Sequence, residues 1–365
     1  MESMVNSQLF GNIYQGRRVL LTGHTGFKGS WLTLWLKELG GNITGIALPP
    51  EARPNHWDLL NLDIEEHLID IRDSDILRKT IKKTQPEIIF HLAAQPLVRR
   101  SYSDPLETWS TNVMGTVNLL EACRVCPSIK AIVVITTDKC YENEEWIWGY
   151  RENDRLGGYD PYSASKAGTE LVVASYRKSF FIYPGAPLLA TARAGNVIGG
   201  GDWSEDRLIP DIVRSVQNDV NLLIRSPQAT RPWQHVLESL SGYLLLGQKL
   251  LCSDKSFAEA WNFGPGFEGN QNVEKIITLM KSTWPAIRWQ QVDEPRPHEA
   301  LLLQLDSTKA RQKLNWKPVW SFIEGVTETA NWYKTCLETG AIISNDQIKR
   351  YISKAREDRI TWTRI

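Results

Sequence analysis

Residues 18–29 read RVLLTGHTGFKG, and this stretch carries the strongest structural signal in the 365-residue chain. The apolar run at 18–22 predicts a short buried strand, and helical spacing begins at Phe27, directly after the glycines. Glycines between a strand and a helix permit a tight turn and let a pyrophosphate approach the helix N-terminus. The stretch therefore predicts a dinucleotide-binding loop, with a plain turn and glycine cap as the alternative.

Strand and helix patterns alternate from this loop to about residue 193. We expect further strands at 42–47, 67–71, 87–93, 130–136 and 187–191, and helices at 27–39, 74–84, 105–126 and 161–181. Parallel strands need crossover connections, which are usually helices. The alternation therefore predicts an α/β fold, a Rossmann-type doubly wound parallel sheet that helices cover on both faces.

The pattern changes after Arg193, where the glycines at 199–201 open a loop-rich region. Residues 235–251 are typical of a helix and 261–264 of a short strand, and we expect both to return to the main sheet. Later helices are expected at 274–284, 307–314 and 322–338. We therefore expect one domain at 1–193, joined by 235–264, and a smaller, loop-rich C-terminal domain made of 194–234 and 265–365.

Composition argues against several classes of protein. Lys+Arg 42 and Asp+Glu 42 give a net charge of 42 − 42 = 0, which provides no basic footprint for nucleic acid or an anionic membrane. No stretch reaches the roughly 18 apolar residues of a membrane span, and the first residues lack a signal-peptide pattern. Five irregularly spaced cysteines indicate no disulfide framework, so we expect a cytoplasmic protein. The lone Cys123/Cys126 pair and six unclustered histidines predict no metal site.

A second motif is Tyr162-Ser-Ala-Ser-Lys166, at the start of the helix expected at 161–181. A spacing of i, i+4 places the phenol and the ammonium on one helix face, one turn apart. A neighbouring ammonium favours the phenolate and lowers the tyrosine pKa toward a value suited to a base at neutral pH. Such a pair is weak evidence alone, but with the glycine loop and the alternating elements it predicts a site that moves a proton beside a bound dinucleotide.

These two motifs, with His91-Leu-Ala-Ala94, Asn112 and Gly115-Thr116 between them, resemble the extended short-chain dehydrogenase/reductase family over nearly the whole chain. The resemblance implies NAD as the cofactor. It implies as cofactor-binding residues Gly23, Thr25, Gly26, Phe27, Gly29, Asp70, Ile71, Leu92, Ala93, Gln95, Thr111, Tyr162 and Lys166. The stretch 45–50 lacks the acid that normally binds the adenosine ribose, which leaves NADP open. His24 stands where a glycine is common, so we expect its bulk to make NAD binding loose.

Residues 136–141, TTDKCY, stand where the nucleotide-sugar 4,6-dehydratases of this family carry S-T-D-E-x-Y, so Lys139 replaces a glutamate. With 24–31 and 193–202, this replacement resembles the branch that acts on CDP-glucose. The resemblance implies oxidation of the sugar at C4, loss of water across C5–C6 and return of the hydride to C6, in deoxysugar and lipopolysaccharide biosynthesis.

The same resemblance assigns the chemical roles. Tyr162 takes the O4 proton, Lys166 holds the tyrosinate and the nicotinamide ribose, and Thr137 hydrogen-bonds O4. Asp138 is the acid for the departing hydroxyl, which burial favours. Lys139 is either the neutral base that takes the C5 proton or a charged stabiliser of the enolate.

Family position suggests Asn196, Arg231 and Arg296 for the nucleotide sugar, because guanidinium groups donate to diphosphate in a planar fork. The first domain then binds NAD and the C-terminal domain binds the nucleotide sugar. The helices at 105–126 and 161–181 resemble those that pair in family dimers, so we expect a homodimer or a dimer of dimers.

Three alternatives stay open at this point. A nucleotide-sugar 4-epimerase needs no elimination pair, and Asp138 beside Lys139 argues against it. A dehydratase for another sugar nucleotide is disfavoured by Lys139 in place of glutamate. A non-catalytic, NAD-sensing protein is disfavoured because Tyr162 and Lys166 are both present.

Overall fold

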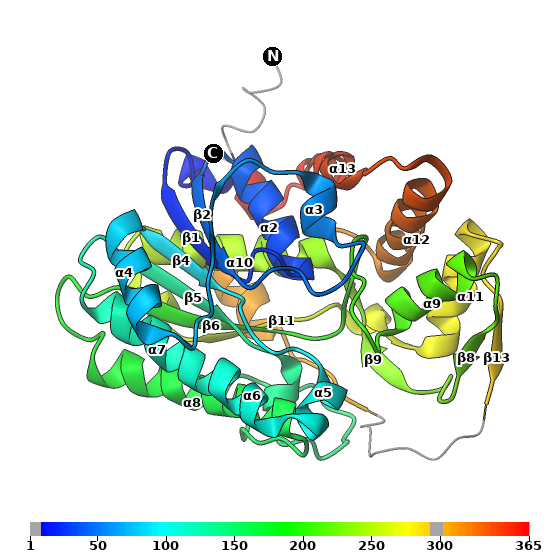
Figure 1. Ribbon diagram of the computed structural model, residues 1–365, viewed down its shortest axis with the longest axis horizontal. Helices are drawn as coiled ribbons and strands as arrows, with labels where there is room; N and C mark the ends of the chain where they lie inside the picture. The colour runs from blue at the N-terminus through cyan, green and yellow to red at the C-terminus, as the bar shows by residue number, and fades with distance from the viewer. Residues whose placement is uncertain (1–8, 293–301, 365) are drawn as a thin grey trace.

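The computed structural model describes residues 9–292 and 302–364. Its centre is a seven-stranded sheet in the order β11-β6-β5-β4-β1-β2-β3, with every neighbouring pair parallel (Figure 1). The strands are β1 (Arg18–Thr22), β2 (Asn42–Ala47), β3 (Glu65–Leu68), β4 (Ile88–His91), β5 (Ala131–Ile135), β6 (Leu188–Ala194) and β11 (Ala260–Phe263). The predicted doubly wound parallel sheet is confirmed.

Helices cover both faces of the sheet, because its strands are apolar on both sides. Successive side chains alternate between the faces, so Leu20 and Ile89 enter one apolar cluster whereas Leu21 and Phe90 enter the other. The first cluster is closed by α4 (Ser74–Thr84), α7 (Gly115–Arg124) and α8 (Pro161–Ser179), along the left and lower side of Figure 1. The second is closed by α2 (Phe27–Glu38), α10 (Val236–Leu251) and α13 (Ser344–Glu357).

A smaller group of elements lies at the right of Figure 1 and is built from residues after the sixth strand of the sheet. It holds α9 (Leu208–Gln217), α11 (Val273–Thr283), α12 (Phe322–Thr339) and the paired strands β8 (Leu222–Ile224) with β13 (Trp289–Gln291) and β9 (Thr230–Pro232) with β12 (Asn270–Asn272). The pair β7 (Val197–Ile198) and β10 (Gln234–His235) lies just after β6 and just before α10. From 235–264, α10 packs on the main sheet and β11 forms its edge. The division at residue 193 into two functional domains stays a prediction.

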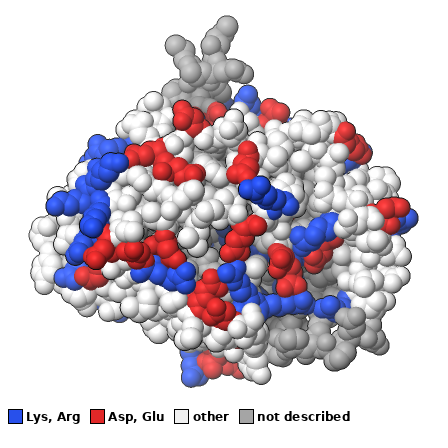
Figure 2. Space-filling model, viewed as in Figure 1, with Lys and Arg blue, Asp and Glu red and all other residues white. Residues whose placement is uncertain are grey.

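Short helices complete the described chain. They are α3 (His56–Leu60), α5 (Val98–Ser103), α6 (Pro105–Trp109), η1 (Leu9–Asn12), η3 (Asp138–Cys140), η4 (Lys255–Phe257), η5 (Phe267–Gly269), η7 (Thr361–Thr363) and the π-type turns η2 (Ser110–Met114) and η6 (Ala310–Leu314). Across the described residues, no helix combines the length and the apolar character that crossing a bilayer would need. On the face drawn in Figure 2, basic and acidic side chains are interspersed.

Three predicted elements differ from the structure. The helix predicted at 307–314 is mainly the π turn η6. The third strand is β3 at Glu65–Leu68 rather than 67–71, because after Leu68 the chain leaves the sheet and the Asp70 side chain accepts a hydrogen bond from the Arg72 N–H. The single helix predicted at 105–126 is α6 and α7 joined by the π turn η2. In that turn the Asn112 carbonyl accepts hydrogen bonds from the Thr116 and Thr169 hydroxyls. Such π turns are frequent at functional sites.

Candidate active site

The glycine loop between β1 and α2 is a cradle that only glycine can form. Gly23 has φ +77°, and a Cβ there would lie 2.7 Å from the Ala93 nitrogen. A Cβ on Gly29 would lie 2.0 Å from the Gly23 oxygen. The N-cap of α2, Gly26, provides no side-chain cap, so the first N–H groups of the helix are left for another acceptor. This geometry fits the pyrophosphate of a dinucleotide.

The side chain of His24 points away from this cradle. It is fully buried beneath β2, where a Cβ on Gly45 would lie 2.7 Å from the imidazole ring. Its Nε2 lies 3.1 Å from Glu66 Oε2, and its ring packs edge-on against Trp57. The expectation that the bulk of His24 obstructs the pyrophosphate is therefore wrong in its steric premise: β2 and β3 accommodate the ring.

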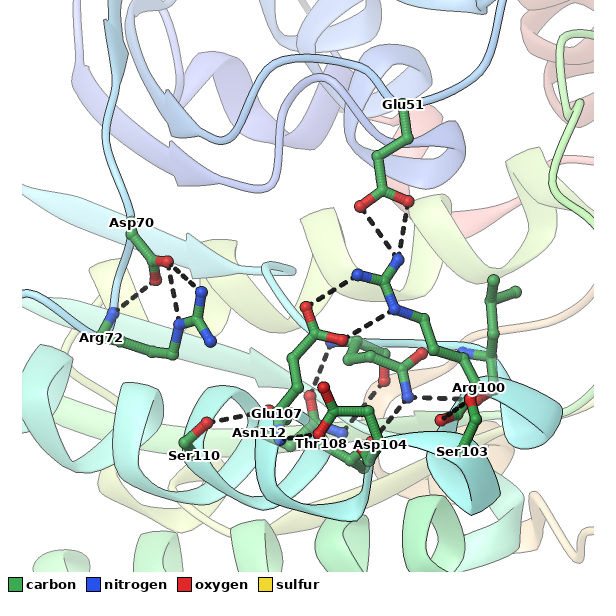
Figure 3. Close-up of polar contacts among 12 residues, drawn as sticks. Glu51, Asp70, Arg72, Arg100, Ser103, Asp104, Glu107, Thr108, Ser110 and Asn112 are labelled. Carbon is green, nitrogen blue, oxygen red and sulfur yellow. Dashed lines mark hydrogen bonds and ion pairs between the residues drawn. The ribbon is translucent and has the colours of Figure 1, made fainter.

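Asp70 and Glu51 lie in the region that we expect to bind adenosine (Figure 3). Residues 45–50, at the end of β2, contain no carboxylate. Asp70 is held by Arg72, whose Nη2 lies 2.6 Å from Asp70 Oδ2 and lowers the Asp70 pKa. Ile71 is buried so tightly that a Cβ on Gly115 would lie 2.5 Å from its Cδ1. The structure thus brings Asp70 and Ile71 beside the start of α7.

Glu51, in the loop after β2, is tied to the helices opposite (Figure 3). Arg100 on α5 donates to both Glu51 oxygens, at 3.0 and 2.8 Å, and to both Glu107 oxygens on α6, at 2.7 and 2.8 Å. This two-carboxylate clamp holds the β2 loop against α5 and α6.

The loop after β4 is fixed by Asn112 of the π turn. Asn112 accepts from the Gln95 N–H at 2.8 Å and donates to the Gln95 carbonyl at 3.1 Å and to Ser165 Oγ at 2.8 Å. The Gln95 side chain is buried and donates to Thr108 and to the Leu97 carbonyl, so it braces its own loop. Asn112 therefore couples the predicted cofactor loop, which contains Leu92 and Ala93 and lies next to Thr111, to the helix that carries Tyr162.

The remaining predicted cofactor residues belong to the glycine loop. Thr25 Oγ1 donates to the Leu48 carbonyl at 2.9 Å and closes the loop onto the end of β2. Phe27, half-buried, would lie 3.3 Å from a Cβ on Gly199. The loop is thus tied to the end of β2, and the Phe27 ring that follows it faces Gly199.

Thr137, Asp138 and Tyr162 come together at the carboxyl end of β5. All three are buried, with 8%, 2% and 9% of their surface exposed. Thr137 Oγ1 donates to Asp138 Oδ1 at 2.9 Å, and Asp138 Oδ2 has no hydrogen-bond partner among the described residues. Burial raises the Asp138 pKa, and the charge of Lys139 and the Thr137 hydrogen bond oppose this only in part. Asp138 is therefore suited to holding a proton.

Tyr162 and Lys166 lie at the start of α8, but burial dominates the pKa of each. Burial raises the Tyr162 pKa to about 12, against a side-chain hydrogen bond with Thr137 and the charge of Arg207. Burial lowers the Lys166 pKa to about 8, and Lys166 Nζ donates to the Ile135 carbonyl at 3.3 Å. The expected lowering of the tyrosine pKa is therefore absent from the isolated chain, because desolvation of the phenolate outweighs its neighbours.

Lys139 and Lys28 complete the polar surroundings of Asp138. Lys139 is half-buried in η3, and its N–H donates to Thr137 Oγ1 at 3.3 Å. Lys28, inside the glycine motif, was not predicted as a site residue. Burial and then the Arg207 charge lower its pKa to about 7, and it interacts electrostatically with Asp138 and Lys166. The sequence signal that could have identified Lys28 is a lysine at a position of the predicted helix that faces inward.

A second buried polar group lies further along α8. Glu170 and Arg193 form an ion pair in which Nη2 and Oε2 are 2.8 Å apart and both side chains are 3% exposed. Thr136 and Thr191 hydroxyls also donate to Glu170. Burial pushes the Glu170 pKa up, but Arg193 and these hydroxyls lower it overall.

The predicted substrate residues lie on the other side of Asp138. A Cβ on Gly195 would lie 3.1 Å from Asp138 Oδ2 and 2.7 Å from Pro232, so the segments that contain Asn196 and Arg231 both approach that oxygen. The Asn196 backbone carbonyl accepts from the Gln234 N–H at 3.0 Å, and the charge of the buried Arg231 partly opposes the rise that burial gives the Asp138 pKa. Arg296 lies outside the described residues.

Within the described ranges, no three His, Cys, Asp or Glu side chains gather as a metal-binding group.

These features define a buried acid–base site beside a dinucleotide cradle, and comparison with known proteins identifies the class. The model of the GDP-mannose 4,6 dehydratase family matches residues 20–329. The chain therefore belongs to this family. It is 50% identical to the CDP-glucose 4,6-dehydratase of Salmonella typhimurium over 351 residues, which cover 94% of this chain and 98% of that protein.

Solved structures of the same fold include enzymes of two kinds. An epimerase of Methanothermobacter thermautotrophicus superposes with a TM-score of 0.78 at 24% identity, covering 92% of this chain and 96% of that chain. The dTDP-glucose 4,6-dehydratase of Streptomyces venezuelae, solved with NAD and TYD bound, gives 0.75 at 24% identity, covering 87% and 97%. The fold is therefore common to epimerases and dehydratases, and the site must separate them.

Proposed function

We propose that this chain converts CDP-glucose to CDP-4-keto-6-deoxyglucose, as an NAD-dependent 4,6-dehydratase. The Asp138 carboxyl is the observation that carries the proposal. It is buried, bonded to Thr137 beside Tyr162, and leaves Oδ2 without a partner among the described residues. Such a group can deliver a proton to a departing hydroxyl, a step that a 4-epimerase does not need. The 50% identity with the Salmonella typhimurium enzyme supports CDP-glucose as the substrate.

Oxidation at C4 falls to the residues at the start of α8. Tyr162 takes the O4 proton as the phenolate, a form that the positive charge of bound NAD, together with Lys166, would favour over the neutral phenol of the chain alone. Thr137 hydrogen-bonds O4. Lys166 stabilises the phenolate and holds the nicotinamide ribose. NAD, when bound, supplies the ring that accepts the C4 hydride and gives it back at C6. The residues that hold it are those of the glycine loop, Asp70 and Ile71, and the β4 loop.

Elimination falls to Asp138 and Lys139. The C4 ketone acidifies the C5 hydrogen, so a base removes that proton while Asp138 protonates the leaving hydroxyl. Lys139 acts there either as the base or as a cation that stabilises the enolate. Two variants separate these roles: Lys139→Arg keeps the charge and removes the basicity, whereas Lys139→Met removes both.

The nucleotide sugar is bound by the C-terminal domain of residues 194–234 and 265–365, and NAD by residues 1–193 with 235–264. Arg231 and Asn196 support this assignment, because the segments that carry them both approach the Asp138 carboxyl. Arg296 is assigned to the diphosphate on family position.

The test is incubation of the NAD-supplemented protein with CDP-, UDP-, GDP- and dTDP-glucose, followed by mass analysis. We expect loss of one water from CDP-glucose, with slower or no reaction of the others. An isomer of unchanged mass would indicate an epimerase, and loss of water only from another sugar nucleotide would overturn the substrate. No reaction, with NAD bound, would favour a cofactor-sensing protein.

We also propose that the protein is a homodimer, or a dimer of such dimers. Leu106 and Trp109 on α6, Met114 beside α7 and Leu171 on α8 are exposed apolar side chains on helices that pack together. A second copy would bury them in a four-helix bundle. Light scattering should give an oligomer that Leu106→Glu with Leu171→Glu dissociates, and a monomeric parent would contradict the proposal.

A cytoplasmic location is proposed on the state of the cysteines. All five are free, and Cys123, Cys126 and Cys140 are buried, as a reducing compartment permits. Fractionation of the source cells would test this, and recovery outside the cytoplasm would overturn it.

A further inference from the structure

The proposed reaction leaves a proton in the wrong place at the end of each turnover. Tyr162 gains the O4 proton when the hydride leaves C4. Asp138 then loses a proton to the departing hydroxyl, which leaves as water when the C6–O bond breaks. The C5 proton goes to the base and returns to C5 after the hydride reaches C6. The net result is one extra proton on Tyr162 and one missing from Asp138.

The structure places a single hydroxyl between these two residues. Thr137 Oγ1 donates to Asp138 Oδ1 at 2.9 Å, and the Thr137 side chain, as a hydrogen-bond partner of the phenol, partly opposes the rise that burial gives the Tyr162 pKa. The Lys139 N–H donates to the same oxygen at 3.3 Å and holds the hydroxyl in place. One hydroxyl thus contacts both the residue that must lose a proton and the residue that must gain one.

We propose that Thr137 is a proton relay that resets the site, accepting the proton of Tyr162 while passing its own to Asp138. The O–H bond of Tyr162 breaks as a new O–H bond forms at Thr137, and the old Thr137 O–H bond breaks as one forms at Asp138. Nothing is oxidised or reduced. This inference rests on the proposed dehydratase function.

The surroundings favour this internal path over exchange with bulk water. Asp138 is 2% exposed, and its other oxygen has no partner among the described residues. Thr137 and Tyr162 are almost as deeply buried. A proton from solvent would therefore have to reach side chains that are at most 9% exposed, whereas the relay needs only two transfers through the Thr137 hydroxyl.

The preceding residue offers a matched control. Thr136 is also buried, but its hydroxyl donates to Glu170, away from Asp138. Thr136→Val removes a buried threonine hydroxyl one position away and leaves the relay intact. Comparison of the two threonines therefore separates the relay from a general loss of packing or polarity.

The experiment is a rapid-quench assay of product with NAD and CDP-glucose for the parent, Thr137→Val, Thr137→Ser and Thr136→Val. In Thr137→Val we expect a burst of one product per site, followed by steady turnover at least about tenfold slower than the first turnover. Small acids in the buffer should accelerate only that slow phase. Thr137→Ser restores the relay hydroxyl and should remove the burst, and Thr136→Val should show none.

Equal slowing of first and later turnovers in Thr137→Val, without buffer acceleration, would overturn the relay and leave Thr137 only as a ligand of O4. Thr137→Ala provides the same comparison if the valine variant does not fold. Failure of the proposed function is distinct, because the parent would then make no ketosugar from CDP-glucose.

Discussion

Asp138, in η3 beside the start of α8, and Glu170, in the middle of α8, are buried to nearly the same depth, but their pKa values shift in opposite directions. Asp138 is 2% exposed and has a raised pKa, whereas Glu170, with 3% exposed, has a lowered one. Asp138 receives one hydrogen bond from a hydroxyl and keeps one oxygen without a partner among the described residues. Glu170 receives two guanidinium N–H groups from Arg193 and two threonine hydroxyls.

The difference shows that partners, rather than burial, decide the charge of a carboxyl in this protein. Desolvation acts on both groups in the same direction, toward the neutral acid. Only Glu170 has a cation in direct, forked contact to offset it. Glu170, whose two oxygens both accept hydrogen bonds, ties α8 to β6. Asp138, which has one oxygen without a partner among the described residues, is available for chemistry.

The largest effect is expected when the Asp138 carboxyl is replaced by an amide, which has no acidic proton to give. Asp138→Asn should lower turnover by about 10²- to 10⁴-fold because the leaving hydroxyl loses its acid, while stability stays at or above the parent value. C4 oxidation does not use Asp138, so bound NADH should accumulate and can be followed by absorbance. Tyr162→Phe is the control, because it blocks the earlier step and should give no NADH. A rate above half that of the parent would remove Asp138 from the mechanism.

A large loss of folding stability is expected when Glu170 loses its cation, Arg193. Arg193→Leu should destabilise the fold by about 3–5 kcal/mol because Glu170 is left buried without a counter-charge. Urea unfolding measures this. Adding Glu170→Leu to Arg193→Leu should recover part of the loss, since it removes the unpaired charge. A single variant within about 1 kcal/mol of the parent would show that burial of Glu170 needs no partner.

A smaller effect is expected from the neighbouring threonine. Thr136→Val removes one hydrogen bond to the charged Glu170 and should cost about 1.5–3 kcal/mol of unfolding free energy. Turnover, corrected for the folded fraction, should stay near the parent value. The reverse outcome, full stability with lost turnover, would mean that Thr136 belongs to the reacting site.

How far the sequence alone predicts these two regions follows from the range of the interactions. The glycine cradle is encoded within 18–29, because its geometry depends on the backbone freedom of Gly23 and on contacts close in the chain. The Glu170–Arg193 pair joins α8 to β6 across the sheet, and no local pattern announces it. The elements were therefore predicted better than the partners of their side chains.

The predictions that differ from the structure fail for the same reason, which is that they depend on contacts between segments distant in the chain. The sequence predicts obstruction by the His24 side chain because the residue lies inside the glycine motif. The space beside Gly45 that receives the ring is formed by β2, which no local pattern in the motif predicts. The helix α13 was missed because its mean character is polar, although Ile348, Tyr351, Ile352 and Ala355 repeat at the spacing of one buried face. The π turn at Asn112 depends on Thr169, which lies in another helix.

The smallest expected effect is a difference in sign between the pH dependence contributed by the two carboxyls. The Glu170 pKa is lower in the folded than in the unfolded chain, so its contribution to stability is present above the unfolded value of about 4.3 and is lost as the pH falls through the folded value. The Asp138 pKa is raised on folding, so the folded state binds the proton more tightly. Its contribution is therefore lost as the pH rises from the unfolded value of about 3.9 through the folded one.

Urea unfolding across this range should show that Asp138→Asn gains stability relative to the parent as the pH rises. Glu170→Gln should lose stability relative to the parent over the same rise, because it forgoes the ion pair. Equal slopes for the two variants would mean that the two carboxyls share one protonation state, and the contrast between them would then lie in geometry alone.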